Sequence, residues 1–187
     1  MRIYVASSWR NTLQPAVVVE LRRAGHEVYD FRNPGPGSCG FAWSQIDADW
    51  LQWTPRTFVE ALKHPVAKHG FGDDKNGLDW CDACVLVLPC GRSAHLEAGY
   101  AIGKGKQTYF LLHPDKFEPE LMYLLGDGFA HDIPSLIKLL LYPRQPQSKD
   151  ERWAQLDREK KLEMLAAGGR ADIARRDGKD FPAGGSR

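Results

Sequence analysis

The stretch from Ala83 to Ala101, which reads ACVLVLPCGRSAHLEAGYA, constrains the fold more than any other part of the chain. The continuous apolar run over Cys84–Leu88 predicts a buried parallel strand, and a Pro-Cys-Gly-Arg-Ser loop then leads into a helical pattern with Glu97 in its opening turns. A buried strand that passes through a glycine loop into a helix is how open α/β sheets build a ligand crevice. An acid among apolar neighbours is costly to ionise, so Glu97 needs a structural or functional explanation.

Strand and helix patterns alternate around this unit. Predicted strands lie at Arg2–Ala6, Glu27–Phe31, Ala83–Leu88, Thr108–Leu112 and Gly128–His131. Predicted helices lie at about Asn11–Ala24, Pro55–Lys63 after a Thr54 cap, Asp73–Trp80, Ser93–Gly103, Glu118–Leu125, and from an Asp132 cap to about Leu141. Such alternation requires right-handed crossovers and a parallel sheet. We therefore predict a flavodoxin-like (Rossmann-like) α/β three-layer sandwich with a five-stranded parallel sheet, followed by a C-terminal helical tail.

Two segments depart from the alternation. Within a first domain at 1–142, the segment 33–54 forms an insertion with a Pro-Gly-Pro-Gly turn and the tryptophans Trp43, Trp50 and Trp53. These rings either pack a small cluster under the insertion or cover a ligand as a lid. The remainder, 143–187, is predicted to be a Pro/Gln linker, a charged helix to about Ala167 and a disordered end rich in glycine and charge.

Composition narrows the partners and the compartment. The formal net charge is +1, which argues against binding of polymeric nucleic acid or of a membrane through a basic surface. The sequence has no 18-residue apolar run and enters a strand pattern at its first residues, so we expect a soluble cytoplasmic protein. Cys81 and Cys84 could form half of a zinc site, but no second close Cys/His pair accompanies them, which favours buried free thiols and no metal.

Three segments should meet at the carboxyl ends of the central strands. The residues they bring are Ser7, Ser8, Trp9 and Arg10 after the first strand, Asp73 and Asp74 ahead of the third, and Gly91, Arg92, Ser93 and Glu97 after it. Together they offer hydroxyls, an aromatic ring, arginine and carboxylates. This set suits a sugar that carries a flat base and a phosphate.

In this order and spacing, three matches resemble the nucleoside 2-deoxyribosyltransferase family and its relatives, the nucleoside 5′-monophosphate N-glycosidases. They are Ile3–Trp9 (IYVASSW), Asp74 eight residues before Asp82, and Ser93–Ala101 (SAHLEAGYA), which is similar to the family's E-x-G-[YF]-A helix. The resemblance covers roughly residues 1–113 without the 33–54 insertion. It implies a homo-oligomer, a dimer or larger, that acts on a small nucleoside or nucleotide without a metal or organic cofactor.

The resemblance also implies a role for individual residues. Glu97 would be the nucleophile that forms a glycosyl ester with the anomeric carbon, and Tyr4 would hydrogen-bond and orient it. Asp74 or its neighbour Asp73 would protonate or hydrogen-bond the departing base, which requires a raised pKa. Trp9 would stack on the base.

One departure from the family bears on the substrate. Its transferases carry an acidic residue about six positions before the nucleophile, where this chain has Gly91 and Arg92. Glycine amides, an arginine and a helix N-terminus at Ser93 attract phosphate. We therefore expect hydrolysis of a (deoxy)nucleoside 5′-monophosphate that releases the free base. The alternatives are base exchange by a 2-deoxyribosyltransferase and a non-catalytic module that senses nucleotides.

Each candidate residue also has a purely structural interpretation. Glu97 can complement a helix dipole, and Asp73 or Asp74 can cap the helix that follows them. Tyr4 can be an ordinary core residue of a central strand. Trp9 can form a surface cation–π pair with the arginine next to it.

Overall fold

The computed structural model describes residues 1–35, 39–114, 116, 118–142, 158, 162, 163 and 166. The chain divides into two compact units, Met1–Pro143 and Arg144–Arg187. In the second unit the four described residues are helical, whereas the predicted linker, the rest of the charged helix and the predicted disordered end lie outside the described residues. No helix in the described part of the chain is long and apolar enough to cross a membrane.

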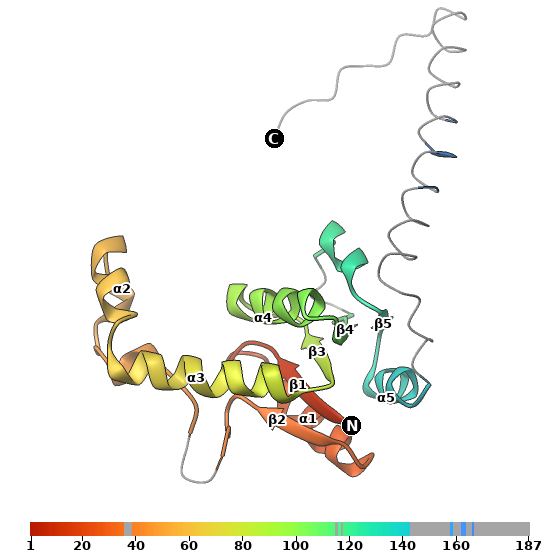
Figure 1. Ribbon diagram of the computed structural model, residues 1–187, viewed down its shortest axis with the longest axis horizontal. Coiled ribbons are helices and arrows are strands. Elements are labelled where there is room, and N and C mark those ends of the chain that lie inside the picture. Colours follow the sequence, from red (N-terminus) through yellow and green to blue (C-terminus); the bar gives the residue numbers. More distant parts are fainter. Residues whose placement is uncertain are drawn as a thin grey trace, which may run out of the picture. The chain divides into compact units, whose positions relative to one another are not determined.

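Five parallel strands form one sheet in the order β2-β1-β3-β4-β5 (Figure 1). The strands are β1 (Arg2–Ala6), β2 (Glu27–Asp30), β3 (Ala83–Val87), β4 (Gln107–Leu111) and β5 (Gly128–Ala130). The predicted flavodoxin-like α/β fold is confirmed. The chain reverses its direction of travel across the sheet between β1 and β3, which is where such sheets open a ligand crevice at their carboxyl ends.

Helices cover both faces of the sheet. The helices α1 (Gln14–Arg23) and α5 (Ile133–Leu141) pack on one face, and α3 (Pro65–Trp80) and α4 (Arg92–Gly103) pack on the other. Side chains of β1 alternate between these layers, so Ile3 and Val5 join the α1/α5 core while Tyr4 and Ala6 join the α3/α4 core. This alternation places Tyr4 on the same face as the helix that carries Glu97.

Side-chain caps set where several helices begin. Thr54 accepts a hydrogen bond from the Thr57 amide at 3.3 Å and starts α2 (Pro55–Ala61), and Asp132 accepts one from Ser135 at 2.7 Å and starts α5, as predicted. The helix α1 begins at Gln14 rather than Asn11. The Asn11 carboxamide oxygen accepts the amides of Leu13 at 2.8 Å and of Gln14 at 3.0 Å, which keeps Asn11 outside the helix.

The predicted start of the third helix at Asp73 is wrong, because α3 begins at Pro65. The His64 ring nitrogen accepts the Val66 amide at 3.2 Å, and proline occupies the first helical position. Glycines within the segment had obscured the helical pattern. Asp73 and Asp74 therefore lie inside a 16-residue helix, and neither is its N-cap.

A short 3-10 helix, η3 (Leu121–Leu125), replaces the longer helix predicted at Glu118–Leu125. The Glu120 carboxylate accepts the Met122 amide at 3.0 Å and starts this turn late. Gly126 ends it, packed so closely on the Phe110 ring that an added Cβ would lie 1.9 Å from a ring carbon. The edge strand β5 then pairs with β4 as predicted.

The 33–54 insertion contains two short 3-10 helices, η1 (Trp43–Gln45) and η2 (Trp50–Gln52). Trp43 meets Phe41, Trp53 and Phe58 edge-on, with ring centroids 4.7, 5.4 and 5.7 Å away. Phe41 in turn lies against Gly70 of α3, where a Cβ would come within 2.6 Å of it. For Trp43 and Trp53 the contacts favour the packing interpretation, because the cluster joins the insertion to α2 and α3. The helix α2 meets α3 at the end of α3 farthest from β3 (Figure 1).

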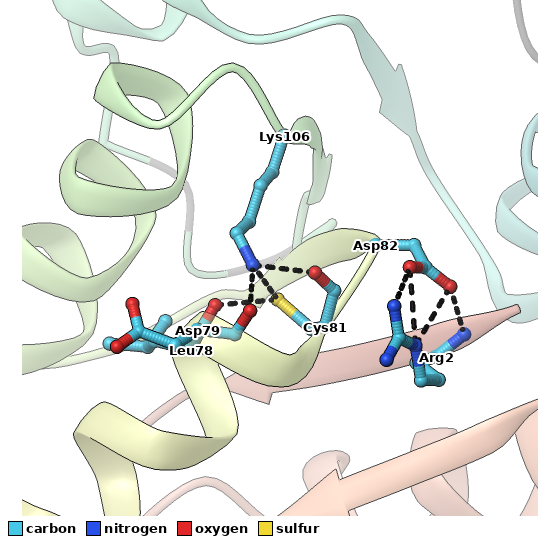
Figure 2. Close-up of polar contacts among 6 residues, drawn as sticks. All are labelled: Arg2, Leu78, Asp79, Cys81, Asp82 and Lys106. Carbon is cyan, nitrogen blue, oxygen red and sulfur yellow. Dashed lines mark hydrogen bonds and ion pairs between the residues drawn. The ribbon is translucent and has the colours of Figure 1, made fainter.

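Two polar clamps fix the amino ends of the strands (Figure 2). Arg2 and Asp82 form an ion pair of 2.6 Å between the starts of β1 and β3, and this contact lowers the pKa of Asp82 to about 2. The Lys106 ammonium donates to the carbonyls of Asp79 at 2.7 Å and Cys81 at 2.6 Å. Cys81 and Cys84 are buried free thiols. The clamps anchor the end of the sheet opposite the crevice.

Candidate active site

Two tyrosines and two acids come together from four elements on the α3/α4 face. Tyr4 of β1 and Tyr29 of β2 are partners in the parallel register, and their rings stack with centroids 5.0 Å apart at 11°. The Tyr29 hydroxyl donates to Asp74 Oδ1 of α3 at 3.0 Å. Burial raises the pKa of Tyr4, and the charges of Glu97 on α4 and of Asp74 raise it further. The structure thus unites the predicted Tyr4, Asp74 and Glu97 and adds Tyr29.

A glycine allows α3 to approach these rings. Gly77 lies one turn beyond Asp74 and is buried against the Tyr29 ring, where an added Cβ would come within 2.8 Å of ring carbons. A side chain at this position would push α3 away from β2. The small residue therefore keeps the Asp74 carboxylate within reach of the Tyr29 hydroxyl.

Glu97 lies deeper in its helix than the sequence suggested. The helix α4 begins at Arg92 with Gly91 as its N-cap, so the prediction of Ser93 as the cap is wrong and Glu97 belongs to the second turn. The dipole of a helix acts mainly within its first turn, which holds no acid here. The interpretation of Glu97 as a partner of the helix dipole therefore loses its basis.

Burial changes the acidity of both carboxyl groups. It raises the pKa of Glu97 from 4.5 to about 7, with a further rise from the charge of Asp74 and an opposing effect of the Tyr4 hydroxyl. Burial likewise raises the pKa of Asp74 from 3.8 to about 6, against the hydrogen bond from Tyr29. Between these values the pair holds about one shared proton. One carboxylate and one carboxylic acid can thus face a substrate together near neutral pH.

The Tyr4 hydroxyl lies close to Glu97 but forms no hydrogen bond of standard geometry with it. The Tyr4 hydroxyl lowers the pKa of Glu97 as a hydrogen bond would, yet it meets no partner among the described residues with standard hydrogen-bond geometry. Tyr4 is fully buried, so it serves the core as well as the site.

The raised pKa of Glu97 predicts that Glu97→Gln stabilises the protein relative to the wild type, and does so more at pH 8 than at pH 4. Below the ordinary pKa of 4.5 both folded and unfolded chains are protonated, whereas between pH 4.5 and about 7 only the unfolded chain ionises freely. The wild type therefore loses stability as pH rises through this window. We expect the stability advantage of Glu97→Gln to grow by about 2 to 3 kcal/mol from pH 4 to pH 8.

Urea unfolding at the two pH values measures this advantage. The exposed Glu60, paired with Lys63 on α2, supplies the control variant Glu60→Gln, for which we expect a change within about 0.5 kcal/mol. An advantage of Glu97→Gln that is equal at pH 4 and pH 8 would show that Glu97 is not desolvated.

The contacts of Asp73 lie outside the pair formed by Glu97 and Asp74. Its carboxylate lies 3.7 Å from the His69 ring, one turn earlier on α3. It also lines a surface cavity of about 430 Å³ next to β2, together with Asn33 and Asn76. Of the two adjacent aspartates, Asp74 is the one that accepts the hydrogen bond of Tyr29 and whose charge raises the pKa of Glu97.

The two serines after β1 are both engaged within the protein. Ser7 donates to the Val87 carbonyl at 2.8 Å and joins the carboxyl ends of β1 and β3. The Ser8 hydroxyl oxygen accepts the Arg10 amide at 3.2 Å. Ser7 therefore shapes the floor of the crevice, and Ser8 holds a local turn.

Arg32 organises the loop that presents Trp9, a role that sequence analysis does not predict. Its Nη2 donates to the carbonyls of Ser8, Trp9 and Asn11 at 3.2, 2.9 and 2.8 Å. Its guanidinium also lies 5.5 Å from the centroid of the Trp9 ring. The cation on this ring is thus Arg32, so the alternative interpretation of Trp9 as the partner of Arg10 is not supported. Trp9 remains 48% exposed, so part of its ring is available to a ligand.

We expect Arg32→Met to lower the free energy of unfolding by about 1 to 3 kcal/mol, because three carbonyls lose a charged donor. Urea denaturation measures the change. Arg10→Met is the matched control, since the exposed Arg10 side chain makes none of these three bonds and should change stability by less than about 0.5 kcal/mol. Equal effects of the two variants would contradict the assigned role of Arg32.

Gly91, Arg92 and Ser93 are exposed at the N-terminus of α4. Gly91 has no side chain to cap the helix, so amides of the first turn remain available to an anion. His95 behind them binds the Gly91 carbonyl through Nδ1 at 3.0 Å and the Tyr123 hydroxyl through Nε2 at 2.9 Å. Burial raises the pKa of Cys90 to about 12, so this thiol is protonated and is not a nucleophile paired with His95.

Two hollows of the surface lie beside α4. A cavity of about 490 Å³ lies beside Pro89, His95 and Tyr123, and an apolar groove of about 760 Å³ runs along α4 beside Leu96 and Met122. Glu97 and Asp74 line neither of them. The candidate site is therefore identified by its ionisable groups and not by cavity size.

No family model and no curated protein matches the chain. Among solved structures it is similar to a 2-deoxyribosyltransferase from Bacillus psychrosaccharolyticus, with 21% identity and a TM-score of 0.49 over 73% of this chain and 90% of that one. It is also similar to a CMP N-glycosidase from Clostridium botulinum, with 16% identity and a TM-score of 0.41 over 75% of this chain and 98% of that one. Both are enzymes of the classes that the sequence resemblance names, one transferring and one cleaving glycosyl bonds. Similarity at this level does not assign an activity to the chain.

Proposed function

We propose that this protein hydrolyses the N-glycosidic bond of a (deoxy)nucleoside 5′-monophosphate through a covalent glycosyl ester on Glu97. The observation that carries the proposal is a pair of desolvated acids, Glu97 and Asp74, that holds about one proton near neutral pH. Two carboxyl groups in different protonation states are what retaining glycoside hydrolysis requires.

The pKa of Glu97, at about 7, is higher than that of Asp74, at about 6, so the shared proton lies mainly on Glu97 in the empty site and moves to Asp74 in the reacting form. In the first step the Glu97 carboxylate of this form attacks the anomeric carbon of the sugar. The bond from this carbon to the base nitrogen breaks, and its electron pair leaves with the base. The Asp74 carboxylic acid gives its proton to the base, which departs neutral. The sugar phosphate is now an ester of Glu97, and Asp74 is a carboxylate.

In the second step a water molecule replaces Glu97 at the same carbon. The Asp74 carboxylate takes a proton from the water as its oxygen attacks, and the ester bond breaks with its electron pair returning to Glu97. The products are the free base and the sugar phosphate. Both acids are back in their starting states.

The choice of a monophosphate rests on the start of α4. Gly91, Arg92 and Ser93 are exposed there, with uncapped amides and an arginine in place of the acid that transferases of the resembled family carry. Glu97 follows on the same helix, so a phosphate at its start would leave the sugar near the nucleophile. The exposed part of Trp9 offers a stacking surface for the base.

Chromatography of base release tests the proposal on a panel of ribo- and deoxyribonucleosides and their 5′-monophosphates. We expect at least one monophosphate to be cleaved, at least roughly 10-fold faster than its nucleoside. A nucleoside that reacts faster than its monophosphate overturns the assigned phosphate site. A second base in the mixture should yield no exchanged product, and its appearance would identify a transferase. Binding without any release would identify a sensing module.

A further inference from the structure

Tyr29 connects the two halves of the candidate site. Its ring stacks on Tyr4, which lies next to Glu97, and its hydroxyl donates to Asp74 Oδ1 at 3.0 Å. The stack at 5.0 Å and the fit of Gly77 under the ring restrict the side chain on two sides. The resemblance discussed above assigns Tyr29 no role.

We propose that Tyr29 is a positioning residue that aims the proton of Asp74 at the leaving base, which rests on the proposed function of the site. The hydroxyl occupies Oδ1 of the carboxyl group, and an oxygen that accepts this hydrogen bond serves as the carbonyl oxygen of the acid form. Oδ2 then carries the transferable proton. Because Tyr29 is locked between Tyr4 and α3, the direction of this proton is fixed before substrate binds.

The charged and titratable groups around Asp74 come from α3 itself and from α4 and the strands β1, β2 and β3. Asp73 precedes it on α3, Glu97 faces it from α4, and Tyr4 lies on β1; burial and the charge of Asp73 raise the pKa of Asp74 while Tyr29 lowers it. The buried Cys84 of β3 adds a neutral thiol near Tyr4 and Glu97, since burial holds its pKa well above the ordinary value. Tyr29 is thus the group that opposes protonation of Asp74. Its loss should raise the pKa of Asp74.

The variant Tyr29→Phe keeps the stack and removes only the hydroxyl. We expect kcat to fall about 10-fold with KM changed less than about 2-fold, because aim is lost while binding is kept. The alkaline limb of the kcat profile should move up by about 0.5 to 1 pH unit, since a general acid with a higher pKa stays protonated to higher pH. Carbon-13 NMR titration of the aspartate carboxyl groups should show the same upward shift for Asp74.

Tyr109→Phe is the matched control. Tyr109 is likewise a strand tyrosine, but it is buried in the α1/α5 core and its hydroxyl has no hydrogen-bond partner in the described residues. This variant should leave kcat, the alkaline limb and the Asp74 titration unchanged, whatever it does to stability. An active wild type in which Tyr29→Phe moves neither the limb nor the Asp74 titration overturns the role of Tyr29 alone. A wild type that releases no base from any substrate overturns the proposed function and this inference with it.

Discussion

Glu97→Gln should lower kcat for base release by at least roughly 10³-fold, the largest effect expected of a single substitution in this chain. Glutamine fills the same space but cannot form the glycosyl ester as a carboxylate does. Because shape and most polar contacts are kept, KM should change by less than about 3-fold. Steady-state chromatography on the best monophosphate substrate measures both values.

A substitution of a surface acid is the control for the effect of Glu97→Gln on kcat. Glu60→Gln on α2 should keep the wild-type rate, because Glu60 lies at the surface and pairs with Lys63. A loss of activity in the Glu97 variant should not result from misfolding, because this variant is expected to be more stable than the wild type at neutral pH. A folded Glu97→Gln protein that retains more than a tenth of the activity would rule out the nucleophile role.

Asp74→Asn should lower kcat by roughly 10² to 10³-fold and remove the alkaline limb of the pH profile. In the wild type the active form is the singly protonated pair, so the profile should be a bell between the pKa values of about 6 and about 7. Asparagine has no proton to lose, so activity should no longer fall in alkali. The remaining limb should follow the ionisation of Glu97 alone, with a pKa below about 7, because the charge of Asp74 no longer raises it.

Asp73→Asn discriminates between the two adjacent aspartates. Asp73 contacts His69 and lines a surface cavity, so its loss should cost less than about 3-fold in kcat. A greater loss from Asp73→Asn than from Asp74→Asn would transfer the role of general acid to Asp73. An unchanged alkaline limb in Asp74→Asn would mean that another group donates the proton.

The fold could be predicted because its signals are local. The strand patterns of Arg2–Ala6 and Ala83–Val87 are each followed by a loop and a helix. This order predicts a parallel sheet without any knowledge of how the side chains pack. The start of α3 could not be predicted as readily. Its cap is the ring of His64, which is rarely a cap, and glycines at 70 and 72 interrupt the apolar pattern.

Sequence analysis could predict only those site residues that are recognised by their spacing along the chain. Glu97 and Asp74 could be predicted from their spacing along the sequence. The position of Tyr29 in the site depends on the register of β1 against β2, which the spacing does not reveal. One signal existed, because Tyr4 and Tyr29 are each the third residue of their strands and parallel pairing brings equal positions together. Arg32 gave no such signal. Its partners are backbone carbonyls, which are the same in every sequence.

The most direct test of a glycosyl–Glu97 intermediate is the stereochemistry of the reaction in aqueous methanol. Methanol intercepts the sugar as a methyl glycoside, whose anomeric configuration does not interconvert and is read by proton NMR. Two successive displacements through Glu97 predict the β-methyl glycoside, with the configuration of the β-nucleotide retained. The α-methyl glycoside would mean a single displacement by solvent, and Glu97 would then not be the nucleophile.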